Sequence, residues 1–454
     1  AGITINGIDA GTAYDVTPTT TRKATVVAGD SPVIHIETTS TFLINDFSVN
    51  DRDTLQVHGS TDGETITVDT TVAPAVVQVG GLLPVNFTLG NIESLRVLGG
   101  AGDDTFDVTP GAIPIFIDGG DPIGTSAGDL LNVISGGGVL FEPGPESDEG
   151  GVITGGNARI SYDHIEALGV FNAAKAIIVG TGADDEITAV ARTEQADPPM
   201  FVGANGVQDF TTSVNDGAEI LWVDTPLLFI DGANGDDDIT LRTPAPNNAD
   251  WDVDVFVAGG LPSTPEVGDR LRVETPYRSD KVTYQPTASD AGIMTLANAA
   301  GTAVDVTIYI GQWAIDHDGD GLDDYVSSPG GVEQLLYDGV SSEGSFDHNN
   351  DTGETTQDTP TAYTDHLTVL GDGFVPGGDS ADRFVHTPGS APDAGTVAMF
   401  DLTNKQTMLG ISYNNLGLDA TVTIDGQEGS DMLVAEGTDL SDTFVVDRTA
   451  PATG

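Results

Sequence analysis

The clearest candidate for chemistry in this sequence is an acidic loop between positions 316 and 324, which reads DHDGDGLDD. Acids stand at positions 1, 3, 5 and 9 of the loop, and glycine stands at position 6. This spacing can wrap side-chain oxygens and one backbone carbonyl around a single hard cation, while glycine permits the sharp central turn. Ser327 occupies position 12, so the loop itself supplies no bidentate Glu there and a closing ligand must come from elsewhere. The predicted Ca²⁺ ligands are Asp316, Asp318, Asp320, Leu322 and Asp324.

A second acidic loop follows at 347–358, where Asp358 at position 12 supplies a possible closing carboxylate. It has Thr352 at position 6, and the glycine comes one residue later. Clustered carboxylates repel one another unless they are neutralised, so a solvated acidic loop is the alternative to a calcium site. Zinc is disfavoured because the neighbouring histidines are isolated and the chain has no cysteine. The predicted ligands are Asp347, Asn349, Asp351 and Asp358.

A nine-residue turn pattern recurs along the chain, most clearly as GGAGDDTFD at Gly99–Asp107. Its glycines allow a close turn, so that backbone carbonyls and the Asp at position six can converge on a cation. A Gly-Asp turn between strands that needs no metal is the competing interpretation. Degenerate copies lie at Gly59–Thr67, Gly180–Thr188, Gly232–Thr240, Gly426–Val434 and Gly437–Val445. The candidate ligands at position six are Asp104, Asp185, Asp237 and Asp431.

These motifs resemble those of known calcium proteins. The nine-residue turns are similar to hemolysin-type (RTX) calcium repeats, although here most copies lie singly rather than in tandem. The loop at 316–324 resembles the calcium loops of EF-hand, dockerin and thrombospondin type 3 modules. Repeats such as Asn91–Val108, NIESLRVLGGAGDDTFDV, resemble those of giant surface proteins of planctomycete-like bacteria. The resemblance implies a large secreted surface or matrix protein that binds calcium.

The excess of acidic residues excludes some classes of binding partner. The 454 residues include 71 Asp and Glu against 15 Lys and Arg, a formal net charge of −56, and no Cys. Such a charge repels phosphate backbones and anionic lipid, so we expect no nucleic-acid binding and no membrane insertion. Without disulfides, oxygen-liganded cations are the obvious alternative crosslink. Adaptation to high salt is a second explanation for the excess of acids.

Signals of an active site are weak. The seven histidines are scattered without an H-E-x-x-H arrangement, and no phosphate-binding P-loop is present. Pairs of acids such as Asp103–Asp104 are expected by composition alone. We therefore predict that the protein is not an enzyme, with a polysaccharide-acting β-helix as the form an enzyme would take. Trp222, Trp251 and Trp313 are expected in the core rather than in a sugar-binding platform.

The elements that position these turns are short strands. Runs of four to six Val, Ile, Thr and Phe residues end in Gly, Asp or Pro, which predicts an all-β fold. The one short helix expected lies at Gly331–Asp338. Phe116–Val133 and Phe256–Val273 align without a gap at an offset of 140 residues, and a shortened copy lies at Phe374–Val385.

The repeats predict tandem β-sandwich-like modules, with a parallel β-solenoid as the alternative. The gap-free block favours discrete modules, whereas strands and turns every 20–30 residues favour a solenoid. The expected organisation is an N-terminal β segment, two β repeat modules, a calcium-loop insertion or linker and an incomplete third module. Their respective ranges are 1–54, 55–170, 171–315, 316–365 and 366–454.

Together these features predict a non-enzymatic, extracellular structural protein. We expect a self-associating subunit of a surface layer, fibre or matrix that is stabilised by calcium. A carbohydrate-binding adhesin is the alternative. An unpaired strand edge invites pairing with another chain, so we expect head-to-tail polymers in which a terminal strand completes the neighbour's sheet. Deletion of Ala1–Thr17 or Ser441–Gly454 is then expected to abolish polymers and leave a folded monomer.

Overall fold

The computed structural model is all-β, as the sequence predicts, and its described residues contain no helix. The helix expected at Gly331–Asp338 is wrong, because Gln334–Asp338 is a strand paired on both sides within a sheet. Residues described by the structure are 2–7, 11–45, 52–121, 128–193, 204–215, 217–245, 247–261, 268–276, 278–316, 323, 325–339, 364–371, 381–417, 419–427 and 430–437.

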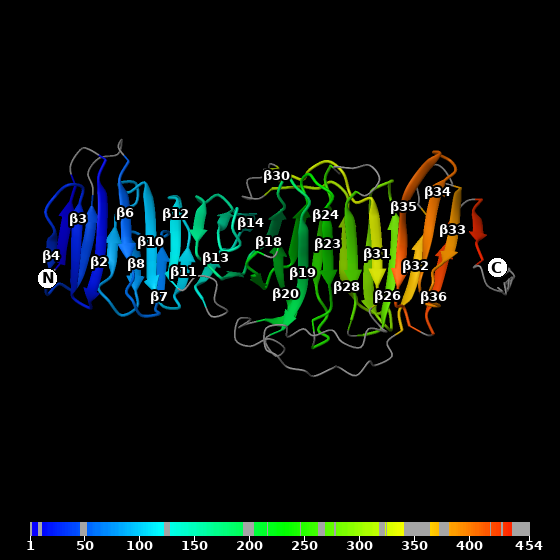
Figure 1. The fold of residues 1–454 in the computed structure, drawn as a ribbon, viewed down its shortest axis with the longest axis horizontal. Helices are drawn as coiled ribbons and strands as arrows, with labels where there is room; N and C mark the ends of the chain where they lie inside the picture. The colour runs from blue at the N-terminus through cyan, green and yellow to red at the C-terminus, as the bar shows by residue number, and fades with distance from the viewer. Residues whose placement is uncertain are drawn as a thin grey trace.

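Two long sheets, called A and B here, face each other and extend along the long axis of the molecule (Figure 1). In spatial order, sheet A contains β1 (Gly2–Asn6), β5 (Thr41–Asn45), β9 (Val85–Phe87), β8 (Ala75–Val79), β7 (Thr65–Asp69), β11 (Thr105–Thr109), β13 (Leu130–Ile134), β17 (Ala167–Phe171), β21 (Ile220–Val223), β20 (Asn205–Val214), β19 (Glu186–Thr193), β23 (Asp238–Arg242), β25 (Arg270–Glu274), β31 (Gln334–Asp338), β35 (Gln406–Asn414), β34 (Gly395–Asp401), β33 (Asp382–Pro388) and β37 (Met432–Ala435).

Sheet B faces sheet A, and its pairings form an open row that begins at β4 and ends at β36. In spatial order it contains β4 (Ile34–Ile36), β3 (Lys23–Ala28), β2 (Ala13–Thr20), β6 (Thr54–His58), β10 (Ser94–Ala101), β12 (Ile115–Asp121), β16 (Ile160–Asp163), β15 (Gly150–Thr154), β14 (Gly138–Pro143), β18 (Lys175–Val179), β22 (Leu227–Asp231), β24 (Val253–Ala258), β28 (Val304–Ile310), β27 (Gly292–Asn298), β26 (Asp280–Pro286), β32 (His366–Leu370) and β36 (Thr421–Asp425).

Alternation of side chains along each strand builds the core between the two sheets. In β11, for example, Phe106 and Val108 point inward and are fully buried, whereas the residues between them are half-exposed. Period-two burial is the property of a strand with one face on a core and one toward solvent. Because nearly every strand repeats this pattern, one apolar core extends along the whole stack.

Chain connectivity combines two kinds of strand. Single strands alternate between the sheets, and each layer of the stack is called a rung here. A single strand pairs in parallel with strands of the same sheet in the neighbouring rungs, as β10 does with β6 and β12. Among the described strands, six three-stranded antiparallel meanders lie between these single strands, each within one sheet. The meanders in sheet B are β2–β4, β14–β16 and β26–β28, and those in sheet A are β7–β9, β19–β21 and β33–β35.

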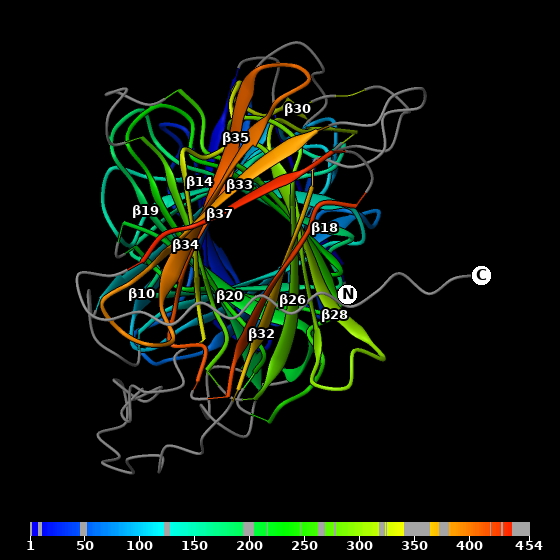
Figure 2. The same cartoon turned by 90° about the vertical axis from the view of Figure 1, so that its right-hand side faces the viewer.

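The architecture therefore has features of both predicted forms. Two sheets face each other across one core, as in a sandwich, while the chain passes between them rung by rung, as in a solenoid (Figure 2). The sheets continue through the whole described chain. Within 316–365, the range expected as an insertion, β31 belongs to sheet A. In the same range β30 (Tyr325–Val326) forms a separate hairpin with β29 (Ala314–Ile315), which directly precedes that range.

The repeated sequence block marks one kind of corner, where the chain passes from sheet B to sheet A. Phe116 and Phe256 lie in β12 and β24, and the Gly-Asp pairs that follow lead into β13 and β25. The described end of the third copy leads into β33, the first strand of a meander. The block thus marks a passage of the chain from sheet B to sheet A, but the strand that follows it can be a single strand or the first strand of a meander.

Candidate functional site

Buried aspartates line the corner at which the chain enters sheet A. Asp104, Asp129, Asp237 and Asp269 directly precede β11, β13, β23 and β25, and each is at most 1 % exposed. A backbone N–H from the preceding rung donates to one carboxylate oxygen of each. The nitrogen–oxygen distances are 2.9 Å from Glu64 to Asp104, 2.6 Å from Asp104 to Asp129, 2.8 Å from Asp185 to Asp237 and 2.9 Å from Asp237 to Asp269. We call this arrangement the carboxylate ladder.

Each run of the ladder ends in a glutamate that forms a reciprocal pair. Asp129 N–H donates to Glu166 Oε2 at 2.6 Å, and Glu166 N–H donates back to the Asp129 carbonyl at 3.0 Å. Asp269 and Glu333 repeat the arrangement at 2.8 and 2.9 Å. The pairs Ile165-Glu166 and Val332-Glu333 thus close the two runs, because each Glu side chain reaches back one rung.

The second oxygen of these carboxylates lies against a glycine. In the described structure Oδ2 of Asp104, Asp129, Asp237 and Asp269 is buried and accepts no hydrogen bond. A Cβ on Gly232 would lie 2.4 Å from both Asp237 Oδ2 and the Gly259 carbonyl oxygen, so only glycine fits there. In the Gly-Gly pairs of the motif, the first glycine permits this close approach. The second, such as Gly100 at φ +115°, supplies left-handed backbone.

Burial sets the electrostatics of the ladder. It raises the pKa of Asp104 and Asp237 to about 7, and that of Asp129 and Asp269 to about 6. The backbone N–H that each carboxylate accepts lowers its pKa, but neighbouring carboxylates raise it again. These groups therefore titrate close to neutral pH, and above it they carry negative charge inside the protein.

The four predicted position-six ligands all belong to these corners. Asp104 and Asp237 accept backbone N–H groups as described, and Asp431 accepts that of Asp382 at 3.1 Å. Asp185 is also buried and accepts the backbone N–H of Thr181 at 2.6 Å. In the part of the chain that the structure describes, no three His, Asp or Glu side chains gather into a metal-sized cluster. Calcium at these turns stays a prediction.

The acidic loop at 316–324 connects the two strands of the β29–β30 hairpin. Ile315 pairs with Tyr325, so the two ends of the loop are held together. Ser327, at position 12 of the motif, is engaged within the hairpin, where its hydroxyl accepts the Trp313 N–H at 3.0 Å. Lys175 Nζ donates to the Asp316 carbonyl. Asp318, Asp320, Leu322 and Asp324 lie outside the described residues, as do Asp347, Asn349, Asp351 and Asp358.

Aromatic packing fixes this hairpin on the outer face of sheet B. Trp313 lies 5.0 Å from Phe229 and 5.4 Å from Tyr325, measured between ring centroids. Asp231, at the end of β22, accepts hydrogen bonds from the Tyr325 hydroxyl and the Ser328 N–H, both at 2.8 Å. These contacts anchor the described residues of the hairpin to sheet B. Trp222 and Trp251 are fully buried in the main core, so no tryptophan ring is available for sugar stacking.

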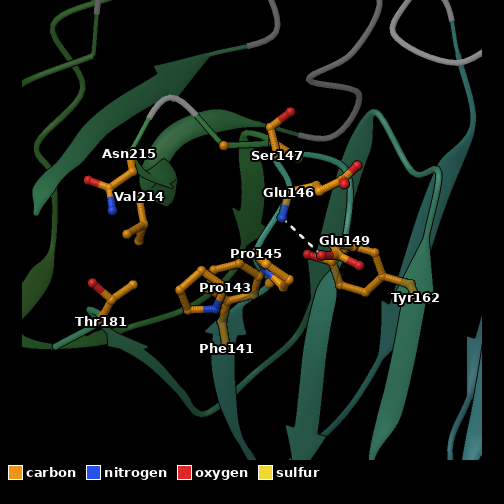
Figure 3. A pocket seen from close by; sticks show the side chains of 13 residues that line it. Phe141, Pro143, Pro145, Glu146, Ser147, Glu149, Tyr162, Thr181, Val214 and Asn215 are labelled. Carbon is orange, nitrogen blue, oxygen red and sulfur yellow. Dashed lines mark hydrogen bonds between the residues drawn. The ribbon is translucent and has the colours of Figure 1, made fainter. Parts of the chain in front are cut away.

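A cavity of about 250 Å³ lies beside the meanders β14–β16 and β19–β21 (Figure 3). Phe141, Pro143 and Tyr162 form its apolar lining, and Glu146 and Glu149 are its acidic residues. Glu149 Oε1 accepts the Glu146 N–H at 2.9 Å, so that carboxylate is engaged within its own loop. The described lining contains no His, Lys or Arg that could pair with a nucleophile.

One sequence match to a catalytic pattern is present at Gly124–Gly128, which reads GTSAG. The G-x-S-x-G elbow of hydrolases joins a strand to a helix. Here the stretch connects β12 to β13, two strands, and residues 122–127 lie outside the described structure. The local context therefore differs from that of the hydrolase elbow.

Comparison with known proteins gives no assignment. The described residues contain no helix long and apolar enough to cross a membrane. No protein-family model matches this chain, and searches of curated proteins and of solved structures returned no significant match.

Proposed function

We propose that this protein is a non-enzymatic, extracellular structural subunit that associates with itself and is stabilised by calcium. The observation that carries the proposal is a stack of two sheets in which the outermost described strand at each end has one edge without a described partner. Among the described strands, β1 and β37 are the outermost of sheet A, and β4 and β36 are the outermost of sheet B. Unpaired strand edges favour pairing with another chain.

Exposed apolar residues at the stack's end support this proposal. In β37, Leu433 pairs with the buried Phe384 and so takes an inward position, yet it is 59 % exposed. An inward apolar side chain that no described strand covers gains free energy when another layer covers it. A subunit of a fibre or layer obtains that cover from its neighbour.

The large negative charge of the chain supports a stabilising role for calcium. A net charge of −56 opposes both folding and association of like chains, and arginine or lysine can offset only a small part of it. The hairpin of β29 and β30 holds together the ends of the loop with the strongest calcium spacing. Millimolar calcium is an extracellular condition, which is why we place the protein outside the cell.

Sedimentation velocity and electron microscopy of the full chain test the proposal. We expect polymers in millimolar Ca²⁺ and mostly monomer after EGTA. The double variant Asp318→Asn, Asp320→Asn should lose the calcium response. Asp30→Asn, Asp419→Asn makes the same charge change at two exposed turns outside the predicted calcium motifs and should retain it. A wild-type chain that stays monomeric in calcium at every concentration would overturn the proposal.

A further inference from the structure

The order of strands follows a long repeat that fixes how two ends can meet. One unit consists of a sheet-B meander, one strand in A, one in B, a sheet-A meander, and then four single strands in the order B, A, B, A. The first unit runs from β2 to β13 and the second from β14 to β25. The third begins at β26, and its described strands stop at β37.

Two outer strands of sheet A have counterparts inside this repeat. β1 directly precedes a sheet-B meander, as do β13 and β25. β37 is the second single strand after a sheet-A meander, as are β11 and β23. In the structure β11 pairs with β13 and β23 pairs with β25, both in parallel. The repeat thus contains, twice, the partner that β37 lacks among the described strands.

We propose that β37 of one copy pairs in parallel with β1 of a second copy, in the register of those two internal pairs. The inference rests on the proposed function and specifies its interface. Since Thr105 pairs with Leu130 and Asp238 with Arg270, Met432 pairs with Gly2 of the second copy. The remaining pairs are Leu433 with Ile3, Val434 with Thr4 and Ala435 with Ile5.

Burial at the two ends fits this junction. Leu433 stands at the inward position that Phe106 and Ile239 hold in β11 and β23, where those side chains are 0 and 1 % exposed. At the other end, Ile3 and Ile5 are only half-buried, whereas their counterparts in β13 and β25 are fully buried. Joining the two ends covers both sets of apolar side chains with each other.

Strand direction in sheet B is compatible with the same junction. β4 runs in the same direction as β2, since both are antiparallel to β3, and β2 is parallel to β6. The outer strands β36 and β4 of two joined copies therefore run the same way. The repeat leaves one sheet-B position between them, which β12 and β24 occupy in the first two units.

The junction differs from an internal rung in one respect. Asp129 and Asp269 precede β13 and β25, but the residue before β1 is Ala1. No carboxylate is therefore present to accept the backbone N–H of the preceding rung. The contact depends on strand pairing and apolar cover, so it should be weaker than the internal rungs and reversible.

The cysteine-free chain allows a direct test by disulfide formation between separate molecules. Thr4→Cys and Val434→Cys introduce thiols at outward positions that the junction places opposite each other. Neighbouring strands lie about 4.8 Å apart, which is within the range a disulfide spans. Oxidation of an equal mixture of the two single variants in calcium should give a covalent dimer, and neither variant alone should give one.

Val72→Cys, an exposed position in the turn between β7 and β8, is the control partner for Thr4→Cys and should not cross-link. Polymers that form without the mixed cross-link, or a symmetric dimer from one variant alone, would overturn this junction and leave the proposed function standing. If the wild-type chain forms no polymers in calcium, the proposed function and this junction are both overturned.

Discussion

Two regions of the molecule bury carboxylates by different means. In the carboxylate ladder, each aspartate accepts a backbone N–H of the preceding rung. At the start of β26, Asp280 and Asp305 instead surround one guanidinium, that of Arg278. Arg278 Nε lies 3.1 Å from Asp280 Oδ1, and its terminal nitrogens contact Asp305 and the more exposed Asp250.

The two regions differ in what compensates the negative charge of their buried carboxylates. Burial raises the pKa in both regions, to about 7 for Asp237 in the ladder and about 7 for Asp280 beside Arg278. In the arginine cluster a cation of the chain itself offsets the charge. In the ladder the N–H dipoles offset only part of it, so protons or external cations must supply the rest.

Removal of the guanidinium should have the largest effect of the variants considered. Arg278→Ala leaves Asp280 and Asp305 buried without a cation, and loss of one partner from a buried pair typically costs about 3–5 kcal/mol. We expect that loss in the free energy of unfolding at pH 8, measured by urea denaturation. The loss should shrink at pH 5, where the two carboxyls are protonated.

Arg270→Ala is the matched control, because Arg270 pairs with Asp238 at 2.8 Å while both side chains are about half-exposed. Exposed pairs contribute about 0–1 kcal/mol. Equal losses for the two variants would contradict the contrast between a buried arginine cluster and the solvent-exposed surface.

The glycine of the ladder corner should give the next largest effect. In Gly180→Ala the new Cβ would lie 2.5 Å from the Gly232 carbonyl oxygen and 2.7 Å from Asp185 Oδ2. Forcing these rungs apart should cost about 1–3 kcal/mol. Gly182→Ala, two residues later in the same turn, has no atom within 4 Å of its Cβ and should be tolerated. Thermal unfolding of both variants makes the comparison, and similar melting temperatures would count against close packing of the rungs.

The smallest effect should come from neutralising one ladder carboxylate. Asp237→Asn keeps an oxygen for the Asp185 N–H and removes the negative charge of a carboxylate whose second oxygen is buried, so we expect a gain of about 1 kcal/mol at pH 8. Asp237→Ala removes the acceptor and should cost about 1–3 kcal/mol. Urea denaturation at both pH values measures each difference from the wild type.

The pH dependence of that comparison has a definite sign. The folded-state pKa of Asp237 is raised from 3.8 to about 7, so the folded form binds the extra proton between these values. Its contribution to stability is complete below pH 3.8 and is lost as the pH rises through 7. The advantage of Asp237→Asn should therefore disappear at pH 5. If Asp237→Asn increased the free energy of unfolding equally at pH 5 and pH 8, Asp237 would not titrate between these two pH values.

Sequence patterns predicted the all-β fold and located its corners, because Gly-Asp turns and period-two strands are local features. They did not reveal the role of the ladder aspartates. A Gly-rich turn with Asp at position six is equally compatible with a calcium turn and with a carboxylate that accepts a backbone N–H of the preceding rung. The acceptor and donor of each ladder bond come from different rungs, as with Asp185 and Asp237, 52 residues apart.

Three other features of the structure could be recognised only in part, or not at all, from the sequence. Ile165-Glu166 matches the Ile-Glu pair in the repeat at Asn91–Val108, but the hydrogen bond from the Asp129 N–H to Glu166 depends on which strands are neighbours. Arg278 was missed, although an arginine two residues before an aspartate is conspicuous in so acidic a chain. The helix expected near Gln334–Asp338 failed because strand pairing on both sides outweighed local propensity.

The most direct test concerns the charge that the fold leaves without a cation of its own. Thermal unfolding of the full chain at pH 8 should be compared in millimolar Ca²⁺ and in NaCl of matched ionic strength. Calcium should raise the melting temperature far more than NaCl, and EGTA should reverse the gain. An equal rise in the two salts would contradict specific calcium stabilisation and favour a general acidic surface adapted to high salt.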